Sequence, residues 1–419
     1  MRIILANRFL YPDEVATSRM MSSLAFGLAA RGHAVDAVAS RQRHDGGAEF
    51  TPRETVNSVR FHRVATARFG GARLMGRAAD YLTYHLSAGW RIWRLAKPGD
   101  VVIVGTDPPL FSVTAALALA GTRASLVNWM LDLFPEAAIR LGLLRPGSPL
   151  SRLLCRLRDM SLRRARLNVA PIERMAELLM ARGISPESIV VMHQWSDGGA
   201  IQPINPAENA LRREWGLQDK FVVGYSGNFG RVHEFGTMLA AAERLRDRAD
   251  IAFLFVGGGQ RHAWVEAEIR RRNLTNVLMK PLQPRERLGN TLCAADAHLV
   301  SLIPELEPCS VPSKFYGILA AGRPTLFVGD PDGEIARVIA RTGCGAAVRI
   351  GEDAVLAAHI LNLAGSAAQR AQMGTAARRT FDAEFREAVG ISVWQGLLSE
   401  LAAPKLHLRG EASGVPVSS

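Results

Sequence analysis

Cysteine is scarce in this sequence, and long apolar runs are missing. The four cysteines, Cys155, Cys293, Cys309 and Cys344, are too widely spread to form a Cys-x-x-Cys pair. No disulfide framework or cysteine-based zinc site follows from that spacing, which favours reduced thiols. The most apolar stretch, residues 110–121, has about half of the ~20 residues that a membrane-spanning helix needs. We therefore expect neither a disulfide-stapled fold nor a spanning helix.

Acidic residues are also few relative to basic ones. The chain has 39 Asp and Glu against 51 Lys and Arg, for a formal net charge of +12. A positive surface favours phosphorylated or anionic partners, such as nucleotides, nucleic acids or lipid headgroups. Hydrophobic residues make up 48% and charged residues 21% of the chain. These values are typical of globular domains and exclude collagen-like, coiled-coil and wholly disordered chains.

Short apolar segments alternate with longer amphipathic ones, which predicts βαβ units and parallel sheets covered by helices. The alternation stops near the middle of the chain, at a segment with two prolines and two glycines, and then resumes. We expect an α/β half at 1–198, a linker at 199–218 and a second α/β half at 219–385. A helix at 386–402 can return to the first half, and 403–419 is predicted to be a disordered tail. The strand candidates lie at 2–6, 34–39, 101–105, 125–130, 221–226, 251–256, 276–279, 297–302 and 324–328.

Positive charge is concentrated in two stretches of the first half. From Arg140 to Arg166 there are eight arginines and one acid, and from Arg63 to Lys97 there are seven cations and one acid. Leucines recur at helical spacing in the former, and tyrosines and tryptophans are interspersed in the latter. Basic amphipathic helices with Leu and Trp are suited to an anionic membrane surface. The alternative is that these apolar side chains face the protein's own core.

The second half opens with a strand, a glycine-rich turn, Gly227-Asn-Phe-Gly230, and a helical pattern. Backbone N–H groups in such a turn can approach an anion, and a helix N-terminus favours negative charge. Arg231 can add a formal positive charge. The alternative is a tight turn that binds nothing.

A second pattern centres on Lys314. Ser310 or Ser313 can cap a helix there, Pro312 suits its opening positions, and Lys314 then lies in the first turn. A lysine in the first turn opposes the helix dipole, which prefers an acid at that end. An anionic ligand that shares the site would remove this conflict. Otherwise Lys314 is simply solvated.

These segments resemble the family 4 glycosyltransferases of bacterial O-antigen and exopolysaccharide biosynthesis. The resemblance spans about residues 1–400 and implies the α/β GT-B fold, in which two Rossmann-like domains with parallel sheets face each other across a cleft. It is carried by residues 225–230, 313–314 and 319–324 in the second half and by 7–19, 32–33, 106–109 and 132–136 in the first.

The resemblance implies a metal-independent, retaining transferase that takes a sugar from a nucleotide-diphosphate sugar. By position, the diphosphate falls on Gly227, Asn228 and Gly230, with Lys314 as its main cation and Arg231 as a second. Fixed donors and a cation stabilise the charge that develops on a departing diphosphate.

Further donor contacts are implied by position in the family. Pro281 and Leu282 fall where backbone groups bracket the base. Ser313 adjoins Lys314, and Glu334 matches the family's donor-binding acid after a Gly-rich loop. The chain departs from the family at two glutamates, which are Cys309 and Gly317 here. Because the second glutamate would bind the ribose, we expect that contact to come from Glu307 or from backbone.

Asp132 and Glu136 are four residues apart across a proline, near the end of a strand that should face the cleft. One of them can orient the acceptor hydroxyl or act as a base. The alternative is a helix N-cap at Asp132 with Glu136 in the first turn. The acceptor and membrane side is further assigned to Arg19, Asp107, Arg152, Arg156 and Arg163.

The leading hypothesis is a peripheral membrane glycosyltransferase that acts on a polyprenyl-diphosphate-linked saccharide. We expect it at the cytoplasmic leaflet, since the apolar stretch at 3–6 is too short for a signal peptide. The expected partners are the nucleotide-diphosphate sugar, the lipid-linked acceptor and the anionic membrane, without cofactor, metal or nucleic acid. Two alternatives stay open. A sugar-nucleotide epimerase of related fold would need no acceptor, and a basic nucleic-acid-binding protein would show a recognition motif that we do not find.

Overall fold

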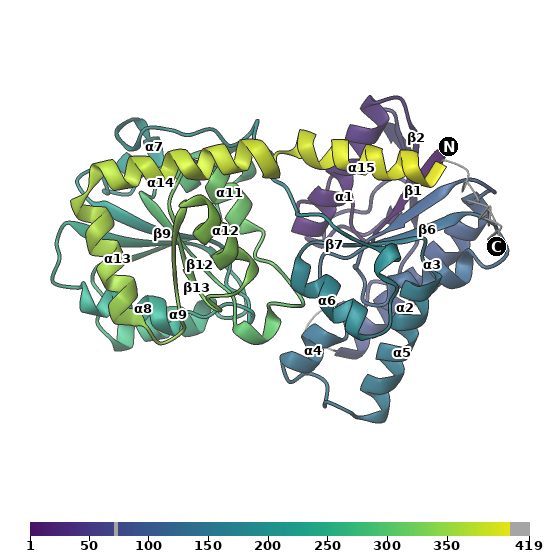
Figure 1. Cartoon of the computed structure of the whole chain (residues 1–419), viewed down its shortest axis with the longest axis horizontal. Coiled ribbons are helices and arrows are strands. Elements are labelled where there is room, and N and C mark those ends of the chain that lie inside the picture. Colours follow the sequence, from purple (N-terminus) through teal and green to yellow (C-terminus); the bar gives the residue numbers. More distant parts are fainter. Residues whose placement is uncertain (71–73, 403–419) are drawn as a thin grey trace, which may run out of the picture.

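The computed structural model describes residues 1–70 and 74–402, which form two α/β domains side by side (Figure 1). The predicted tail at 403–419 lies outside the described residues. Within the described ranges, the strands form an eight-stranded sheet, β3-β4-β2-β1-β5-β6-β7-β8, and a six-stranded sheet, β11-β10-β9-β12-β13-β14. All neighbouring strands in these two sheets are parallel except β3 and β4. The predicted architecture of two parallel-sheet domains is confirmed.

The N-terminal sheet is covered by helices on both faces because its strands are apolar on both sides. In β1, Ile3 and Leu5 pack toward α1, whereas Ile4 and Ala6 pack toward α2 and α3. Its strands are β1 (Arg2–Ala6), β2 (Ala34–Ser40), β3 (Arg53–Val56), β4 (Val59–Val64), β5 (Val101–Val104), β6 (Ser125–Trp129), β7 (Leu167–Ala170) and β8 (Ile189–Val191). Its helices are α1 (Ala16–Ala30), α2 (Leu74–Leu95), α3 (Phe111–Ala118), α4 (Glu136–Arg140), α5 (Pro149–Arg164) and α6 (Glu173–Ala181).

The C-terminal sheet is built in the same way. Its strands are β9 (Phe221–Asn228), β10 (Ile251–Gly258), β11 (Val277–Lys280), β12 (Ala297–Ser301), β13 (Thr325–Val328) and β14 (Gly345–Val348). Its helices are α7 (Ala210–Glu214), α8 (Gly236–Arg244), α9 (His262–Arg271), α10 (Leu288–Cys293), α11 (Lys314–Ala320), α12 (Glu334–Thr342), α13 (Asp353–Gly365) and α14 (Ala367–Thr380).

Part of the expected linker at 199–218 belongs to the C-terminal domain. Leu211 and Leu217 are buried against β9 and β10, and Arg212 forms a 3.0 Å ion pair with Asp296. The polar composition of this segment does not reveal the packing, because few apolar side chains anchor it.

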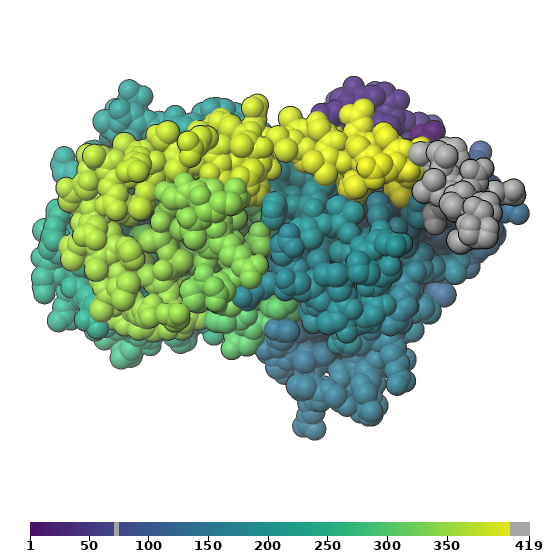
Figure 2. Space-filling view, in the orientation of Figure 1, coloured from purple at the N-terminus to yellow at the C-terminus, as the bar shows by residue number. Residues whose placement is uncertain are grey.

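The end of the described chain crosses back to the first domain. Helix α15 (Glu387–Ala402) continues the line of α14 and lies over the N-terminal domain, as the yellow segment of Figures 1 and 2 shows. Ile391, Trp394 and Leu398 are buried in the N-terminal core. The Trp394 ring meets the Trp129 ring edge to face, with centroids 5.1 Å apart. The last helix therefore completes the core that the first strand begins.

The sequence predicts neither a membrane-spanning helix nor disulfide bonds. In residues 1–70 and 74–402, no helix is both long enough and apolar enough to cross a bilayer. All four cysteines are free and buried.

Candidate functional site

The two domains meet through the segments that follow their strands. Parallel strands bring their carboxyl ends to one edge of a sheet, and ligands of such folds bind outside that edge. Here the two edges face each other. Contacts across this cleft join Asp132 to Ser310 (2.5 Å), the Leu133 N–H to the Cys309 carbonyl (2.8 Å), Arg174 to Asp330 (2.6 Å) and Glu14 to Arg285 (2.9 Å).

Lys314 is the first residue of α11 and lies against the glycine-rich turn. Its Nζ is 2.5 Å from the Tyr225 hydroxyl and 3.8 Å from the centroid of the Tyr225 ring. Gly227 has a φ of 131°, and a Cβ there would lie 3.4 Å from Lys314 Cε. Burial lowers the pKa of Lys314 well below its usual range, with no nearby acid to oppose the shift among the described residues. A lysine in this position is suited to an anionic ligand.

The turn itself depends on glycines at the ends of β9 and β10. A Cβ at Gly257 would lie 2.0 Å from the Gly227 carbonyl oxygen, and one at Gly259 would lie 2.2 Å from Asn228 Oδ1. Asn228 is exposed, whereas Gly230 is buried. These close contacts let the backbone of the turn lie directly beside Lys314, whose other close neighbour is the Tyr225 ring.

The N-terminus of α8 is not free to bind a ligand. The Glu234 carboxylate accepts hydrogen bonds from the Thr237 N–H at 3.1 and 3.0 Å. The expected anion site is therefore reduced to the turn and Lys314, because the chain's own acid already occupies the helix end.

The opposite wall of the cleft carries Asp107 and Asp132, which follow the adjacent strands β5 and β6. Burial raises the pKa of Asp107 to about 6, although the Arg8 guanidinium opposes the shift. The alternative interpretation of Asp132 as a helix cap is wrong, because α4 begins after Pro135 and has no side-chain cap. Instead Asp132 accepts a hydrogen bond from Ser310 of the other domain.

Glu136, predicted to contact the acceptor, instead forms a buried ion pair with Arg158. Both of its carboxylate oxygens accept hydrogen bonds from Arg158, at 2.7 and 2.8 Å, and Arg182 lies 3.0 Å away. Arg158 also pairs with Asp159 at 2.7 Å. All of Glu136, Arg158 and Asp159 are buried. Glu136 is thus committed to joining α4 to α5 and is not available to an acceptor.

Glu307 does not face the open cleft either. It is buried, and its Oε2 accepts a hydrogen bond from the Glu334 N–H at 3.2 Å. A Cβ at Gly333 would lie 2.3 Å from Glu307 Oε1, and burial raises the pKa of Glu307 to about 7. The predicted ribose contact is therefore not open to Glu307 in this arrangement. The Glu334 carboxylate lies 3.5 Å from His193 Nδ1 of the N-terminal domain.

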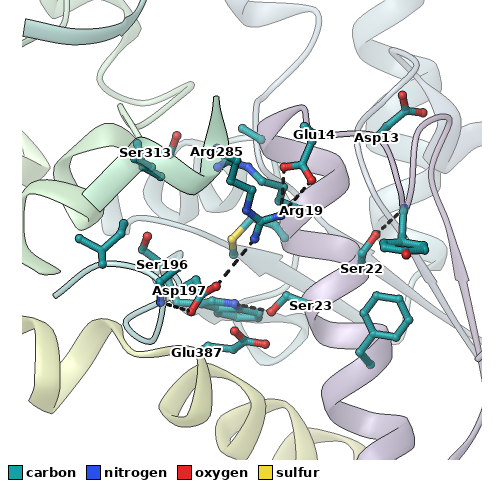
Figure 3. Close-up of a pocket in the computed structure, with 18 residues that line it drawn as sticks. Asp13, Glu14, Arg19, Ser22, Ser23, Ser196, Asp197, Arg285, Ser313 and Glu387 are labelled. Carbon is teal, nitrogen blue, oxygen red and sulfur yellow. Dashed lines mark hydrogen bonds and ion pairs between the residues drawn. The ribbon is translucent and has the colours of Figure 1, made fainter. Parts of the chain in front are cut away.

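A cavity of about 280 Å³ lies between α1, the segment at 195–201 and the C-terminal domain (Figure 3). It brings Arg19, assigned to the acceptor side, into one pocket with Ser313, assigned to the donor side. Arg285 extends into the pocket, pairing with Glu14 and lying 3.7 Å from Asp197. No local sequence pattern reveals these ion pairs, because their partners are far apart in the chain.

The other predicted residues are dispersed. Pro281 and Leu282 follow β11 and are exposed. Arg152, Arg156 and Arg163 are exposed on α5. Arg231 does not line the cavity that holds Ser313 but a second cavity, with Arg140 and Arg261. Among the residues that the structure describes, no cluster of three or more His, Cys, Asp or Glu is placed to hold a metal ion.

Comparisons with known proteins identify both domains. Residues 16–195 match the model of the glycosyl transferase 4-like domain, and residues 207–380 match that of the glycosyl transferases group 1. The probable glycosyltransferase WbjE of Pseudomonas aeruginosa is 29% identical over 282 residues, which are 65% of this chain and 68% of WbjE. The putative colanic acid biosynthesis glycosyl transferase WcaI of Escherichia coli K12 is 31% identical over 226 residues, which are 52% of this chain and 55% of WcaI.

A solved structure extends the comparison to the whole fold. HepE of Anabaena, crystallised with UDP-glucose, superposes with a TM-score of 0.72 at 14% identity, covering 96% of this chain and 100% of HepE.

The buried cluster around Arg158 generates a stability prediction. Replacing Arg158 by Met leaves only the half-buried Arg182 beside the buried acids Glu136 and Asp159, which we expect to lower the free energy of unfolding by up to about 3–5 kcal/mol. Arg156→Met, on the exposed side of the same helix, should change it by less than about 0.5 kcal/mol. Urea unfolding followed by circular dichroism measures both. Equal stability of the two variants would contradict the structural role.

The lowered pKa of Lys314 generates a pH prediction. A bound diphosphate stabilises the ammonium form and raises this pKa, so binding takes up a proton between the free and bound pKa values. Affinity for UDP should fall as pH rises through that window. Calorimetric titrations at about pH 8, where the phosphates are ionised, in buffers of different ionisation enthalpy measure the uptake. Lys314→Met should abolish it, and equal uptake in both proteins would exclude Lys314 as the binding group.

Proposed function

Since the chain belongs to the GT-B glycosyltransferases that join a 4-like domain to a group 1 domain, we propose that it is a retaining enzyme of cell-surface polysaccharide biosynthesis. It moves a sugar from a nucleotide-diphosphate sugar to a polyprenyl-diphosphate-linked saccharide, without a metal. WcaI's name supports the polysaccharide role, and the UDP-glucose bound by HepE supports the donor class.

The observation that carries the proposal is the enclosed lysine beside the Gly227 turn. Lys314 has no acid partner among the described residues, and the glycine lets backbone approach a ligand closely. Breaking a glycosyl–phosphate bond leaves negative charge on the diphosphate. A preorganised ammonium group and backbone donors stabilise that charge as it develops.

The facing wall supplies groups for the acceptor. In this proposal, Asp107 and Asp132 accept a hydrogen bond from the attacking hydroxyl. In a retaining reaction the hydroxyl oxygen bonds to the anomeric carbon on the face from which the phosphate oxygen departs. The hydroxyl proton passes to that departing phosphate oxygen, so no carboxylate nucleophile is required.

Membrane association is proposed from the helices on one face of the N-terminal sheet. On α2, Tyr84, Ala88 and Ile92 are buried, yet a second apolar stripe on the opposite side is exposed, from 53 to 67%. This stripe consists of Leu82, Leu86, Trp90 and Trp93. A core helix needs only one apolar stripe. The second stripe is suited to the interfacial region of a bilayer.

Helix α5 adds charge to the same face. Its packing partner α3 also packs on α2, so the three helices are neighbours. Leu150 and Leu153 of α5 are exposed, and so are Arg152, Arg156 and Arg163. We call these residues, with the α2 stripe, the basic–apolar face. The core alternative holds for part of the apolar side chains in the charged stretches, since Tyr84 of α2 and Leu162 of α5 are buried.

Sugar transfer tests the proposal directly. Incubation with radiolabelled UDP-, GDP- and dTDP-sugars and a lipid-diphosphate-linked saccharide should yield a labelled product with one donor. Lys314→Ala should lower kcat on the order of 10²-fold or more, because it removes charge stabilisation at the leaving group. Sugar isomerisation without an acceptor would instead indicate an epimerase, and near-normal rates in the variant would remove Lys314 from the reaction.

Vesicle flotation tests the basic–apolar face. Reversing Arg152, Arg156 and Arg163 to Glu should weaken binding to anionic vesicles at least about 10²-fold, at ~1 kcal/mol per charge. UDP binding should be unchanged. The matched control reverses three exposed arginines of the C-terminal domain, Arg213, Arg246 and Arg379, and should float normally. Undiminished flotation of the first variant would refute this membrane surface.

A further inference from the structure

Three arginines from distant parts of the chain line a second cavity in the cleft, of about 340 Å³. Arg140 and Leu141 come from the N-terminal domain, and Arg231 and Arg261 come from the C-terminal domain. Arg140 ends α4, Arg231 follows the glycine-rich turn, and Arg261 precedes α9. The cavity is therefore complete only when both domains are present.

None of the three guanidinium groups is neutralised by a carboxylate within 4 Å in residues 1–70 and 74–402. Arg140 donates to the Glu305 carbonyl at 2.5 Å, and Arg261 donates to the His233 carbonyl at 3.3 Å. Arg261 also lies over the Trp264 ring, 5.5 Å from its centroid. Backbone carbonyls orient these two side chains but cancel no charge. Arg140 and Arg231 are exposed, so solvent weakens the repulsion among the three like charges, and an anion that joins them would replace this repulsion with attraction.

This cavity is distinct from the place of the donor diphosphate. Its lining does not include Lys314 or the Gly227 turn. A nucleotide diphosphate held by Lys314 thus leaves the three arginines for a second anion. Arginine is the side chain best matched to phosphate oxygens, because its planar fork donates two parallel hydrogen bonds.

The surroundings of the cavity indicate where that anion comes from. Arg140 is followed by Leu143, whose side chain is exposed, and α4 is joined to α5 through Glu136 and Arg158. Helix α5 carries the exposed leucines and arginines of the basic–apolar face. Figure 1 shows α4 and α5 together at one edge of the N-terminal domain. A lipid chain on that face can reach this end of the cleft with its polar end.

We propose that Arg140, Arg231 and Arg261 bind the diphosphate of the lipid-linked acceptor, which rests on the function proposed above. The acceptor diphosphate and the donor diphosphate then occupy separate cationic sites in one cleft. Arg231, expected from the sequence on the donor diphosphate, is reassigned to the acceptor. Holding the acceptor by its diphosphate fixes the distance from the membrane surface to the sugar that receives the new residue.

Kinetics with two acceptors test the assignment. One is the polyprenyl-diphosphate-linked saccharide, and the other is the same saccharide on a neutral alkyl group. Arg140→Gln and Arg261→Gln should each raise KM for the diphosphate-linked acceptor on the order of 10-fold. KM for the nucleotide sugar should stay the same, and so should the rate with the neutral acceptor. Arg145→Gln, an exposed arginine between α4 and α5, is the matched control and should behave as wild type.

A binding measurement separates this proposal from the proposed function. Farnesyl diphosphate is titrated into protein saturated with UDP, and it should bind the wild type. Its dissociation constant for the Arg140→Gln, Arg261→Gln double variant should be at least about 10-fold higher. No transfer by the wild type from any donor would overturn the proposed function itself. Normal transfer with a raised KM for the nucleotide sugar would assign the arginines to the donor. Loss of vesicle flotation with an unchanged acceptor KM would assign them to lipid headgroups. Either of these last two results would overturn the acceptor assignment.

Discussion

An ammonium group enclosed without a counter-ion is the constraint on which this cleft depends. Lys314 is held between the Tyr225 ring and the Gly227 backbone, and burial disfavours its charged form. Its place requires glycines where two strands end, since a Cβ at Gly257 or Gly259 would collide with the turn. The fold thus tolerates a local electrostatic cost that an anionic substrate removes, and catalysis draws on the same arrangement.

Pairing distinguishes the arginines that build the molecule from those available to a substrate. Arg158 is surrounded by acids and buried, and Arg174 and Arg285 each bind an acid of the other domain. These pairs fix helices and hold the domains together. In the part of the chain that the structure describes, the arginines around the second cavity contact backbone carbonyls and an aromatic ring but no acid. Net charge alone cannot make this distinction, because it depends on which acid is near each base.

The sequence predicts the fold well and the site only in part. All nine strand candidates correspond to strands, but β3, β4, β7, β8 and β14 were not predicted. Strand β4 alternates apolar residues with cations, and β7 has four residues directly after an arginine-rich helix, so both lack a distinct apolar run. Lys314 and the glycine-rich turn lie next to each other, as their motifs predict. Glu136 and Glu307 do not reach the open cleft, because burial and partners 20 or more residues away decide where a carboxylate points.

The return of α15 to the first domain has a consequence for how the chain is made. Trp394 and Leu398 are part of the core around β1, so that core is complete only once the chain has been synthesised as far as α15. Domains usually fold in order as they emerge from the ribosome. Here all the strands of the C-terminal domain are synthesised before α15. Until α15 is made, the core of the N-terminal domain beside α1 lacks Trp394 and Leu398. The core of the N-terminal domain should therefore be completed only after the strands of the C-terminal domain have been made.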